Sequence, residues 1–346
     1  MPMKAIQLQA PKQFRTLDVP EPPSPKPGDA VVRIHRVGIC GTDLSGYLGK
    51  MPFFSYPRIP GHELGVEVVA VGDGVKNVKP GDRCAIEPYI NCQTCYSCTR
   101  GHTNCCENHK TLGVHIDGGL QPLFTIPARK LHVSTKLTLE QLALVETLGI
   151  GLHAINRSNP KPDETVLVLG AGPIGLSVIE FAKLAGSRVI VADMNEKRLA
   201  FVREKMGVNE TLLATGTDDD VKRFDDLTGG KLGNVVVDAT GSAASMAGAY
   251  RFAGFAGRVV FLGITQDPIT FLQPLMHRRE ITFLASRNAL SPEFTRIIRL
   301  IEDGKIDTRP WITHRIPFDG LIDTFPTLLD PTAGVVKAVV EIGEDV

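Results

Sequence analysis

Three short segments of the sequence carry side chains that are able to bind a metal ion. Cys40 lies within Gly38–Asp43, His62 and Glu63 are adjacent, and Glu146 lies in an apolar stretch. A thiolate, an imidazole and a carboxylate together suit zinc, and a catalytic zinc leaves one coordination position open. Taken one at a time, these residues are more simply explained as a core cysteine and a turn histidine. The assignment therefore depends on the rest of the chain.

A second set of metal-ligand residues is much more closely spaced, and consists of Cys92, Cys95, Cys98 and Cys106. Four thiolates at this spacing predict a closed, tetrahedral structural zinc site, and metal binding would supply much of the folding free energy of so polar a segment. The alternative is an iron–sulfur cluster, but the bacterial motif places its fourth cysteine closer and follows it with proline. Cys105 is interpreted as a bystander.

Length and composition indicate an ordinary globular protein with room for two domains. The chain has 346 residues, of which 43% are hydrophobic and 22% charged, and its formal net charge is +0. There is no basic field to attract nucleic acid or an anionic membrane, and no apolar run of signal-peptide or membrane-spanning length. We expect a cytoplasmic protein, in which clustered cysteines bind metal rather than form disulfides.

The hydrophobic pattern changes along the chain and predicts an α/β protein with two domains. Up to about residue 150, β-branched runs bounded by Gly and Pro, such as 30–37 and 66–71, predict a compact antiparallel β domain. From about residue 153, strand runs alternate with helical stretches, which predicts a doubly wound parallel sheet. The strand runs are 165–170, 188–193, 234–239, 258–263 and 280–285.

The last part of the chain returns to the first pattern. Residues 292–303 are predicted to form a helix and 335–342 a strand, which we expect to pack on the first domain. The expected domains are therefore 1–152 with 286–346, including a zinc lobe at about 90–107, and 153–285.

A glycine-rich turn connects the first strand of the parallel region to its helix. It reads Gly170, Ala171, Gly172, Pro173, Ile174, Gly175, and the next strand ends on Asp193. Glycines at this spacing let the backbone approach a pyrophosphate at the helix N-terminus, and the acid accepts from the adenosine ribose. Asp193 also repels a 2′-phosphate, and Met194 follows it where an NADP site more often has a basic residue. NAD is favoured over NADP.

Together these residues resemble the medium-chain, zinc-dependent alcohol and polyol dehydrogenase family over nearly the whole chain. The features that carry the resemblance are the Cys40 and His62–Glu63 segments, the four-cysteine lobe, Glu146 and the glycine turn with Asp193. The resemblance implies a GroES-like β-rich catalytic domain, a Rossmann NAD-binding domain and two zinc ions per chain, one catalytic and one structural. The acid at Glu146 is similar to the sorbitol and threonine dehydrogenase branch, and further segments resemble bacterial sugar-acid and polyol dehydrogenases.

The resemblance also implies roles for individual residues. Cys40 and His62 bind the catalytic zinc, and Glu63 and Glu146 share the third place, one as ligand and the other swinging in or holding the metal-bound water. Asp43 orients His62, unless it only caps a helix turn, and Thr42 begins the proton relay. Many relatives have a histidine where this chain has Ser45, so the route of the proton stays open.

Four residues are expected near the substrate because they lie on loops similar to pocket-lining positions of the polyol branch: Tyr47, His115, Arg287 and Asn288. Arg287 is the most informative of them. Its guanidinium is suited to a substrate carboxylate, which would indicate a sugar acid, and equally to the cofactor pyrophosphate. His115 is more easily explained as structural.

The sequence as a whole predicts a zinc-dependent NAD oxidoreductase that oxidises a secondary hydroxyl of a polyol or sugar acid to a ketone. A threonine-type or simple alcohol dehydrogenase is the alternative enzyme. The alternative without catalysis is a nucleotide-binding redox sensor or scaffold, although such a protein would not need the Cys40 constellation. We expect a homo-oligomer, dimer or tetramer, that does not bind nucleic acid or membrane.

Overall fold

The computed structural model describes residues 2–342, which form two compact units. Unit 1 comprises Met1–Glu146 and Leu290–Val346, and unit 2 comprises Thr147–Ala289. The boundaries expected from the sequence, after residue 152 and before residue 286, differ from these by only a few residues. The GroES-like β-rich fold and the parallel Rossmann sheet expected from the sequence are both confirmed, one in each unit.

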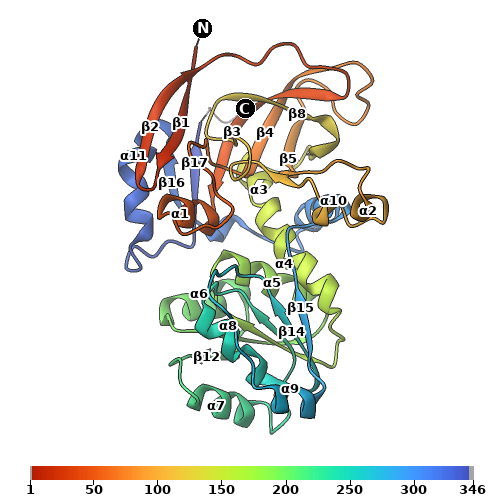
Figure 1. The fold of residues 1–346 in the computed structure, drawn as a ribbon, viewed down its shortest axis with the longest axis vertical. Helices are drawn as coiled ribbons and strands as arrows, with labels where there is room; N and C mark the ends of the chain where they lie inside the picture. The colour runs from red at the N-terminus through yellow and green to blue at the C-terminus, as the bar shows by residue number, and fades with distance from the viewer. Residues whose placement is uncertain (1, 343–346) are drawn as a thin grey trace. The chain divides into compact units, whose positions relative to one another are not determined.

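Unit 1 is built on a seven-stranded sheet of order β16-β17-β3-β4-β5-β9, with β8 also paired to β3, and a separate hairpin of β1 and β2 (Figure 1). Its pairs are antiparallel except for β16 with β17, which is parallel. The strands are β1 (Met3–Ala10), β2 (Gln13–Val19), β3 (Asp29–Ile39), β4 (Glu63–Val71), β5 (Arg83–Ile86), β8 (Leu123–Pro127), β9 (Leu131–Val133), β16 (Ile312–Pro317) and β17 (Lys337–Glu341).

The core of unit 1 lies along β3 and β4, because β-branched residues on both strands are buried. Val32, Val37 and Val66 are each fully buried. The short helix α3 (Leu139–Ala143) packs directly on β4. A Cβ at Gly65 would lie 2.0 Å from the Leu139 carbonyl oxygen, so only glycine permits this approach. α3 leads into α4 (Val145–Ser158), whose first turn carries Glu146.

The remaining elements of unit 1 form a small lobe and short helices. The lobe begins and ends at the paired strands β6 (Tyr89–Ile90) and β7 (Lys110–Thr111), and contains α2 (Tyr96–Thr99) and the turn η1 (Thr103–Cys105). α1 (Gly41–Tyr47) follows β3, and α10 (Ser291–Glu302) is the helix expected over 292–303. Further short elements are η2 (Ala128–Lys130), η4 (Arg309–Trp311), η5 (Phe318–Gly320), α11 (Leu321–Thr324) and η6 (Phe325–Leu329).

Unit 2 is a six-stranded parallel sheet of order β12-β11-β10-β13-β14-β15, flanked by helices (Figure 1). The chain runs from β10 toward one edge and then from β13 toward the other, so the order reverses between β10 and β13, where such folds bind nucleotides. The strands are β10 (Thr165–Leu169), β11 (Arg188–Asp193), β12 (Thr211–Leu213), β13 (Gly233–Asp238), β14 (Ala253–Phe261) and β15 (Thr282–Ala285). The helices are α5 (Pro173–Leu184), α6 (Glu196–Met206), α7 (Asp219–Leu227), α8 (Ala243–Ala249), α9 (Gln273–Arg279) and the turn η3 (Tyr250–Phe252).

Over residues 2–342, none of the helices combines the length and the apolar composition needed to cross a membrane.

Candidate active site

Cys40, His62 and Glu63 lie together at one end of β3 and β4. Each offers one ligand atom, and these three atoms lie within 4.8 Å of one another. Cys40 follows β3 and precedes α1, while Glu63 opens β4 and pairs with Gly38 on β3. The antiparallel pairing thus brings two segments of the sequence into one cluster of metal-ligand atoms.

Gly38 makes room for the Glu63 carboxylate. A Cβ at position 38 would lie 2.0 Å from Glu63 Oε2, which is well inside a van der Waals contact. Gly61, directly before His62, has φ of 101°, a backbone conformation that side chains rarely tolerate. Two glycines of the sequence motifs therefore serve the geometry of the metal ligands beside them.

Lys337 is a site residue that the sequence reasoning missed. Its ammonium donates to both carboxylate oxygens of Glu63 at 2.7 Å, and lies 3.3 Å from the Ile39 carbonyl oxygen. Glu63 and Lys337 are both fully buried, so the two charges compensate one another in a medium that does not solvate them. The only sequence signal is a single lysine within the apolar run 335–340.

Glu146 is buried near the cluster and is held by Tyr89, the second residue that sequence reasoning missed. The Tyr89 hydroxyl donates to Glu146 Oε1, and both side chains are buried. Burial raises the pKa of Glu146; nearby His62 acts against this and Glu63 adds to it. Glu146 does not belong to the group of ligand atoms that Cys40, His62 and Glu63 form, and which of the two acids is the third ligand stays a prediction.

Asp43 lies behind His62. Its Oδ2 accepts from the Cys40 backbone N–H at 2.9 Å, and its Oδ1 is 3.8 Å from His62 Nδ1. Asp43 Oδ1 and His62 Nδ1 are both buried without a hydrogen-bond partner, so each atom could satisfy the other if the two side chains moved closer together. A carboxylate behind a histidine is the usual arrangement for fixing the tautomer of a metal ligand.

The electrostatics of the cluster favour a cation. Burial alone would lower the pKa of His62, but Asp43 and then Cys40 act against it and raise this pKa well above its usual value. The same negative field would stabilise a divalent metal ion. The donor set and the unsatisfied atoms behind it therefore fit a catalytic zinc bound by Cys40, His62 and an acidic residue.

The four lobe cysteines also converge. The ligand atoms of Cys92, Cys95, Cys98 and Cys106 lie within 4.8 Å of one another, and all seven cysteines of the chain are free. Hydrogen bonds from Thr94 lower the pKa of Cys92 to about 5, so its thiolate is readily formed. Cys105 is exposed, outside this group. The arrangement fits a closed structural zinc site, and its difference from the Cys40 cluster is that all four donors are thiolates.

The glycine turn has the geometry of a phosphate-binding loop. Gly170 has φ of 95°, and a Cβ at Gly175 would lie 1.8 Å from the Gly170 carbonyl oxygen. Gly172 is the N-cap of α5, with Pro173 and Ile174 in its first turn. A Cβ at Gly172 would meet only the end of the Arg198 side chain, at 4.0 Å, which leaves the backbone open to a ligand.

Asp193 stands at the end of β11 beside this turn. Its Oδ2 accepts from the Ala171 N–H at 2.7 Å and its Oδ1 from the Asn195 N–H at 2.8 Å. Arg198 Nη1 lies 3.9 Å from Asp193 Oδ2. The acid therefore shapes the turn, and Arg198 places a positive charge next to it.

The residues expected near the substrate have different surroundings. Tyr47 is buried and packs against Phe14 and Phe325, with ring centroids 5.5 and 5.0 Å away. This packing gives its ring a core role, and its part in substrate binding stays a prediction without structural support. His115 Nδ1 accepts from the Thr111 N–H at 3.0 Å, in line with a structural role.

The other expected residues are placed as follows. Arg287 is exposed just after β15, and Asn288 has φ of 56°. Thr42 and Ser45 lie on α1, which follows Cys40 in the sequence, and Thr42 is partly buried. These positions leave the substrate and relay roles as predictions.

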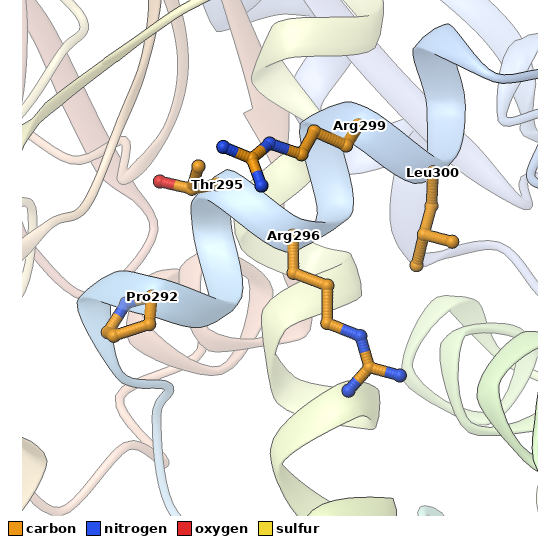
Figure 2. Close-up of a pocket in the computed structure, with 5 residues that line it drawn as sticks. All are labelled: Pro292, Thr295, Arg296, Arg299 and Leu300. Carbon is orange, nitrogen blue, oxygen red and sulfur yellow. The ribbon is translucent and has the colours of Figure 1, made fainter.

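A surface hollow of about 400 Å³ lies on α10 and is lined by Pro292, Thr295, Arg296, Arg299 and Leu300 (Figure 2). The side chains of Arg296 and Arg299 extend in different directions from the helix (Figure 2). An active-site pocket needs convergent polar groups, and the predicted site residues are not among those that line this hollow. The Cys40 cluster, which does bring such groups together, is therefore the better candidate for the active site.

The Glu63–Lys337 pair yields a prediction that separates metal binding from folding. Lys337→Met leaves the Glu63 carboxylate buried without its cation, which should lower the free energy of unfolding of metal-free protein by about 3–5 kcal/mol. Zinc should compensate part of that charge, so the loss measured by urea unfolding should be smaller in zinc-loaded protein. Exposed Lys305→Met is the matched control. Equal losses with and without zinc would contradict a place for Glu63 in the metal centre.

Comparisons with known proteins agree with this geometry. Residues 26–136 match the family model of the alcohol dehydrogenase GroES-like domain, and residues 173–303 match that of the zinc-binding dehydrogenases. L-galactonate-5-dehydrogenase of Escherichia coli K12 is 36% identical over 98% of this chain and 98% of its own length. L-arabinitol 4-dehydrogenase of Hypocrea jecorina is 32% identical, with 91% and 86% covered.

Solved structures extend the agreement to three dimensions. An alcohol dehydrogenase of Escherichia coli CFT073, in complex with the cofactor NADH, superimposes with a TM-score of 0.90 and 29% identity over 99% of both chains. Relatives above 30% identity that span nearly the whole chain establish descent as well as fold. The chain therefore belongs to the medium-chain, zinc-dependent alcohol and polyol dehydrogenase family.

Proposed function

We propose that this dehydrogenase uses NAD to oxidise a secondary hydroxyl of a sugar acid or polyol to a ketone. The observation that carries the proposal is the cluster of Cys40, His62 and Glu63, in a field that favours a cation, with Glu146 buried beside it. The relatives named above act on L-galactonate and L-arabinitol, a sugar acid and a polyol. Their substrates set the chemical class in which the substrate of this chain is sought.

In this proposal the chain's own residues hold and orient the reacting groups. When bound, zinc lowers the pKa of a hydroxyl that it coordinates, and NAD provides the acceptor for the hydride. Cys40 and His62 would hold the metal, and Asp43, whose Oδ1 lies 3.8 Å from His62 Nδ1, would keep His62 in the tautomer that presents its other nitrogen. Thr42, in the first turn of α1, takes the hydroxyl proton as it gives up its own, and Ser45 through water, Glu146 or another group passes that proton to solvent.

We assign the third ligand position to Glu63 and a supporting role to Glu146. Glu63 has its ligand atom in the cluster, although Lys337 holds both of its oxygens. Glu146 has one oxygen held by Tyr89, which leaves the other for a water or a proton in transit. An exchange of the two roles during turnover would need Glu63 to turn away from Lys337.

Arg287 is the group that would select a sugar acid over an uncharged polyol. An exposed guanidinium forms bidentate hydrogen bonds with a carboxylate or with a pyrophosphate. Arg287 could bind either the substrate carboxylate or the cofactor pyrophosphate, because the same positive charge serves both. His115 and Asn288 are kept as residues that shape the surrounding loops.

The proposed activity is tested by removing one metal ligand. Cys40→Ser should abolish NADH formation with galactonate, gulonate, galactitol and sorbitol, and should leave one of the two expected zinc ions, in the lobe. Binding of NADH, followed by fluorescence, should persist because the glycine turn lies in unit 2. Cys105→Ser, at an exposed cysteine outside both clusters, is the matched control and should keep both metal ions and the activity.

The same panel distinguishes the alternatives. Turnover of threonine or ethanol alone by the unaltered protein would replace the sugar-acid and polyol proposal by the amino-alcohol or simple alcohol dehydrogenase. Zinc at the Cys40 cluster without NADH formation from a broad set of alcohols would instead indicate a redox sensor or scaffold.

We propose that the negative charge of Asp193 sets the preference for NAD over NADP. Asp193→Ala should raise the ratio of kcat/KM with NADP to that with NAD on the order of tenfold or more, because a like charge no longer opposes the 2′-phosphate and Arg198 remains nearby. Glu204→Ala, an exposed acid on α6, is the control. An unchanged ratio would show that another residue sets the preference.

We further propose a homo-oligomer formed through β15. This strand is the last in its sheet, so one of its edges is unpaired within the part of the chain that the structure describes. Ile264 and Leu272 nearby in the chain are 51% and 64% exposed. Sedimentation equilibrium at micromolar concentration should give the mass of a dimer or a tetramer of the 37.5 kDa chain, and a monomer mass would contradict the proposal. A cytosolic location, which keeps the free cysteines reduced, is part of the same proposal.

A further inference from the structure

We infer that Tyr89 is a positioning residue for Glu146, and that through Tyr89 the four-cysteine lobe controls the geometry of the catalytic metal centre. The inference rests on the proposed function, because it takes the Cys40 cluster as that centre. It adds Tyr89 to the residues that shape this centre, and it makes the geometry of the Cys40 cluster depend on the four-cysteine lobe.

Tyr89 is placed with little freedom. Its side chain is 2% exposed, and its hydroxyl donates to Glu146 Oε1. The ring lies 6.1 Å from Phe294 of α10 in an edge arrangement, and 6.1 Å from the His109 ring. With the ring enclosed on two sides, the hydroxyl cannot follow Glu146 to a different position. The hydrogen bond therefore fixes the carboxylate rather than the reverse.

Tyr89 is also the first residue of the lobe's base. It pairs with Thr111 in the two-stranded sheet of β6 and β7, and the Leu112 N–H donates to the Pro88 carbonyl oxygen at 3.0 Å. Cys92 follows β6 and Cys106 precedes β7, so the chain enters and leaves the lobe through this pairing. A metal ion bound by both Cys92 and Cys106 would close the loop between β6 and β7, and Tyr89 is the first residue of β6.

Two further contacts hold the residues on either side of β6 to the turn η2, which connects β8 to β9. Arg129 donates to Asn91 Oδ1 at 3.1 Å and to the Asn91 carbonyl oxygen at 2.9 Å. On the other side of Tyr89, buried Lys130 pairs with buried Glu87. Tyr89 thus lies between Glu87 and Asn91, which are both held by η2. Asn91 joins β6 to Cys92, so a displacement of Asn91 is transmitted along β6 to the Tyr89 backbone.

The consequence concerns the second oxygen of Glu146. With Oε1 held by Tyr89, the carboxylate keeps one orientation toward the cluster whose charges it affects, including that of His62. Without the hydroxyl, this buried carboxylate loses the hydrogen bond and is free to rotate. A rotated Glu146 would compete with Glu63 for the metal or withdraw from it, and either change alters the ligand geometry.

The first experiment separates the hydroxyl from the ring. Tyr89→Phe keeps the packing on Phe294 and removes only the hydrogen bond to Glu146. We expect kcat to fall on the order of tenfold with the KM for NAD unchanged, and the metal at the Cys40 cluster to be released several-fold faster to a chelator. In protein carrying cobalt at the Cys40 cluster, the visible absorption bands should shift. Tyr96→Phe, at a lobe tyrosine that is 70% exposed, should match the unaltered protein in all three measurements.

A second variant tests the dependence on the lobe without touching Glu146 or a cysteine. Arg129→Met removes both hydrogen bonds to Asn91 and should also speed release of the metal at the Cys40 cluster, by a smaller factor than Tyr89→Phe. Because both changes act through Tyr89, the double variant Tyr89→Phe with Arg129→Met should release metal no faster than Tyr89→Phe alone. Additive rates would overturn the connection between the lobe and Glu146.

The outcomes distinguish this inference from the proposed function. An unchanged cobalt spectrum and an unchanged release rate in Tyr89→Phe, in protein that is active and binds two metal ions, would refute the role of Tyr89 alone. If metal analysis instead finds no ion at the Cys40 cluster, the proposed function fails, and the inference fails with it.

Discussion

The buried pair of Glu63 and Lys337 is the interaction on which the metal centre depends. Two ions removed from water are stable only when each compensates the other and the remaining hydrogen-bonding capacity is used. Here Lys337 contacts both oxygens of Glu63 and approaches the Ile39 carbonyl oxygen, so the pair joins β17, β3 and β4 at the point where the cluster forms. The arrangement requires glycine at position 38, because a side chain there would occupy the space of the Glu63 carboxylate.

That pair also balances the charge of the centre. Asp43, Glu63 and Glu146 are all buried close to Cys40 and His62. Asp43 and Cys40 act against the effect of burial and raise the pKa of His62 well above its usual value. The same negative surroundings would favour a divalent ion in place of the proton, so metal binding at such a site is expected to release protons.

The two metal centres differ in what their surroundings allow. The lobe brings four cysteine side chains together, which fits a structural zinc, whereas the Cys40 cluster combines a thiol, an imidazole and a carboxylate, which fits a catalytic one. Tyr89 joins them, because it belongs to the base of the lobe by its backbone and to Glu146 by its hydroxyl.

Sequence alone determined the features whose chemistry lies within a short segment. The lobe cysteines, the glycine turn after a strand and the alternation of strands and helices each depend on residues close in the chain, so their spacing is enough to predict a structural metal site, a nucleotide site and a parallel sheet. The resemblance to one family added roles for Cys40 and His62, and the structure brings these two residues together.

Only the tertiary structure decided which distant residues complete the centre. Lys337 is 274 positions from Glu63, and Tyr89 is 57 positions from Glu146. A lysine in an apolar strand and a tyrosine after a proline carry no signal of such partners. Tyr47, expected near the substrate, is buried with its ring packed against Phe14 and Phe325, and its role in substrate binding stays a prediction. Strand pairing and burial, which act across the whole chain, select these contacts, and local spacing does not encode them.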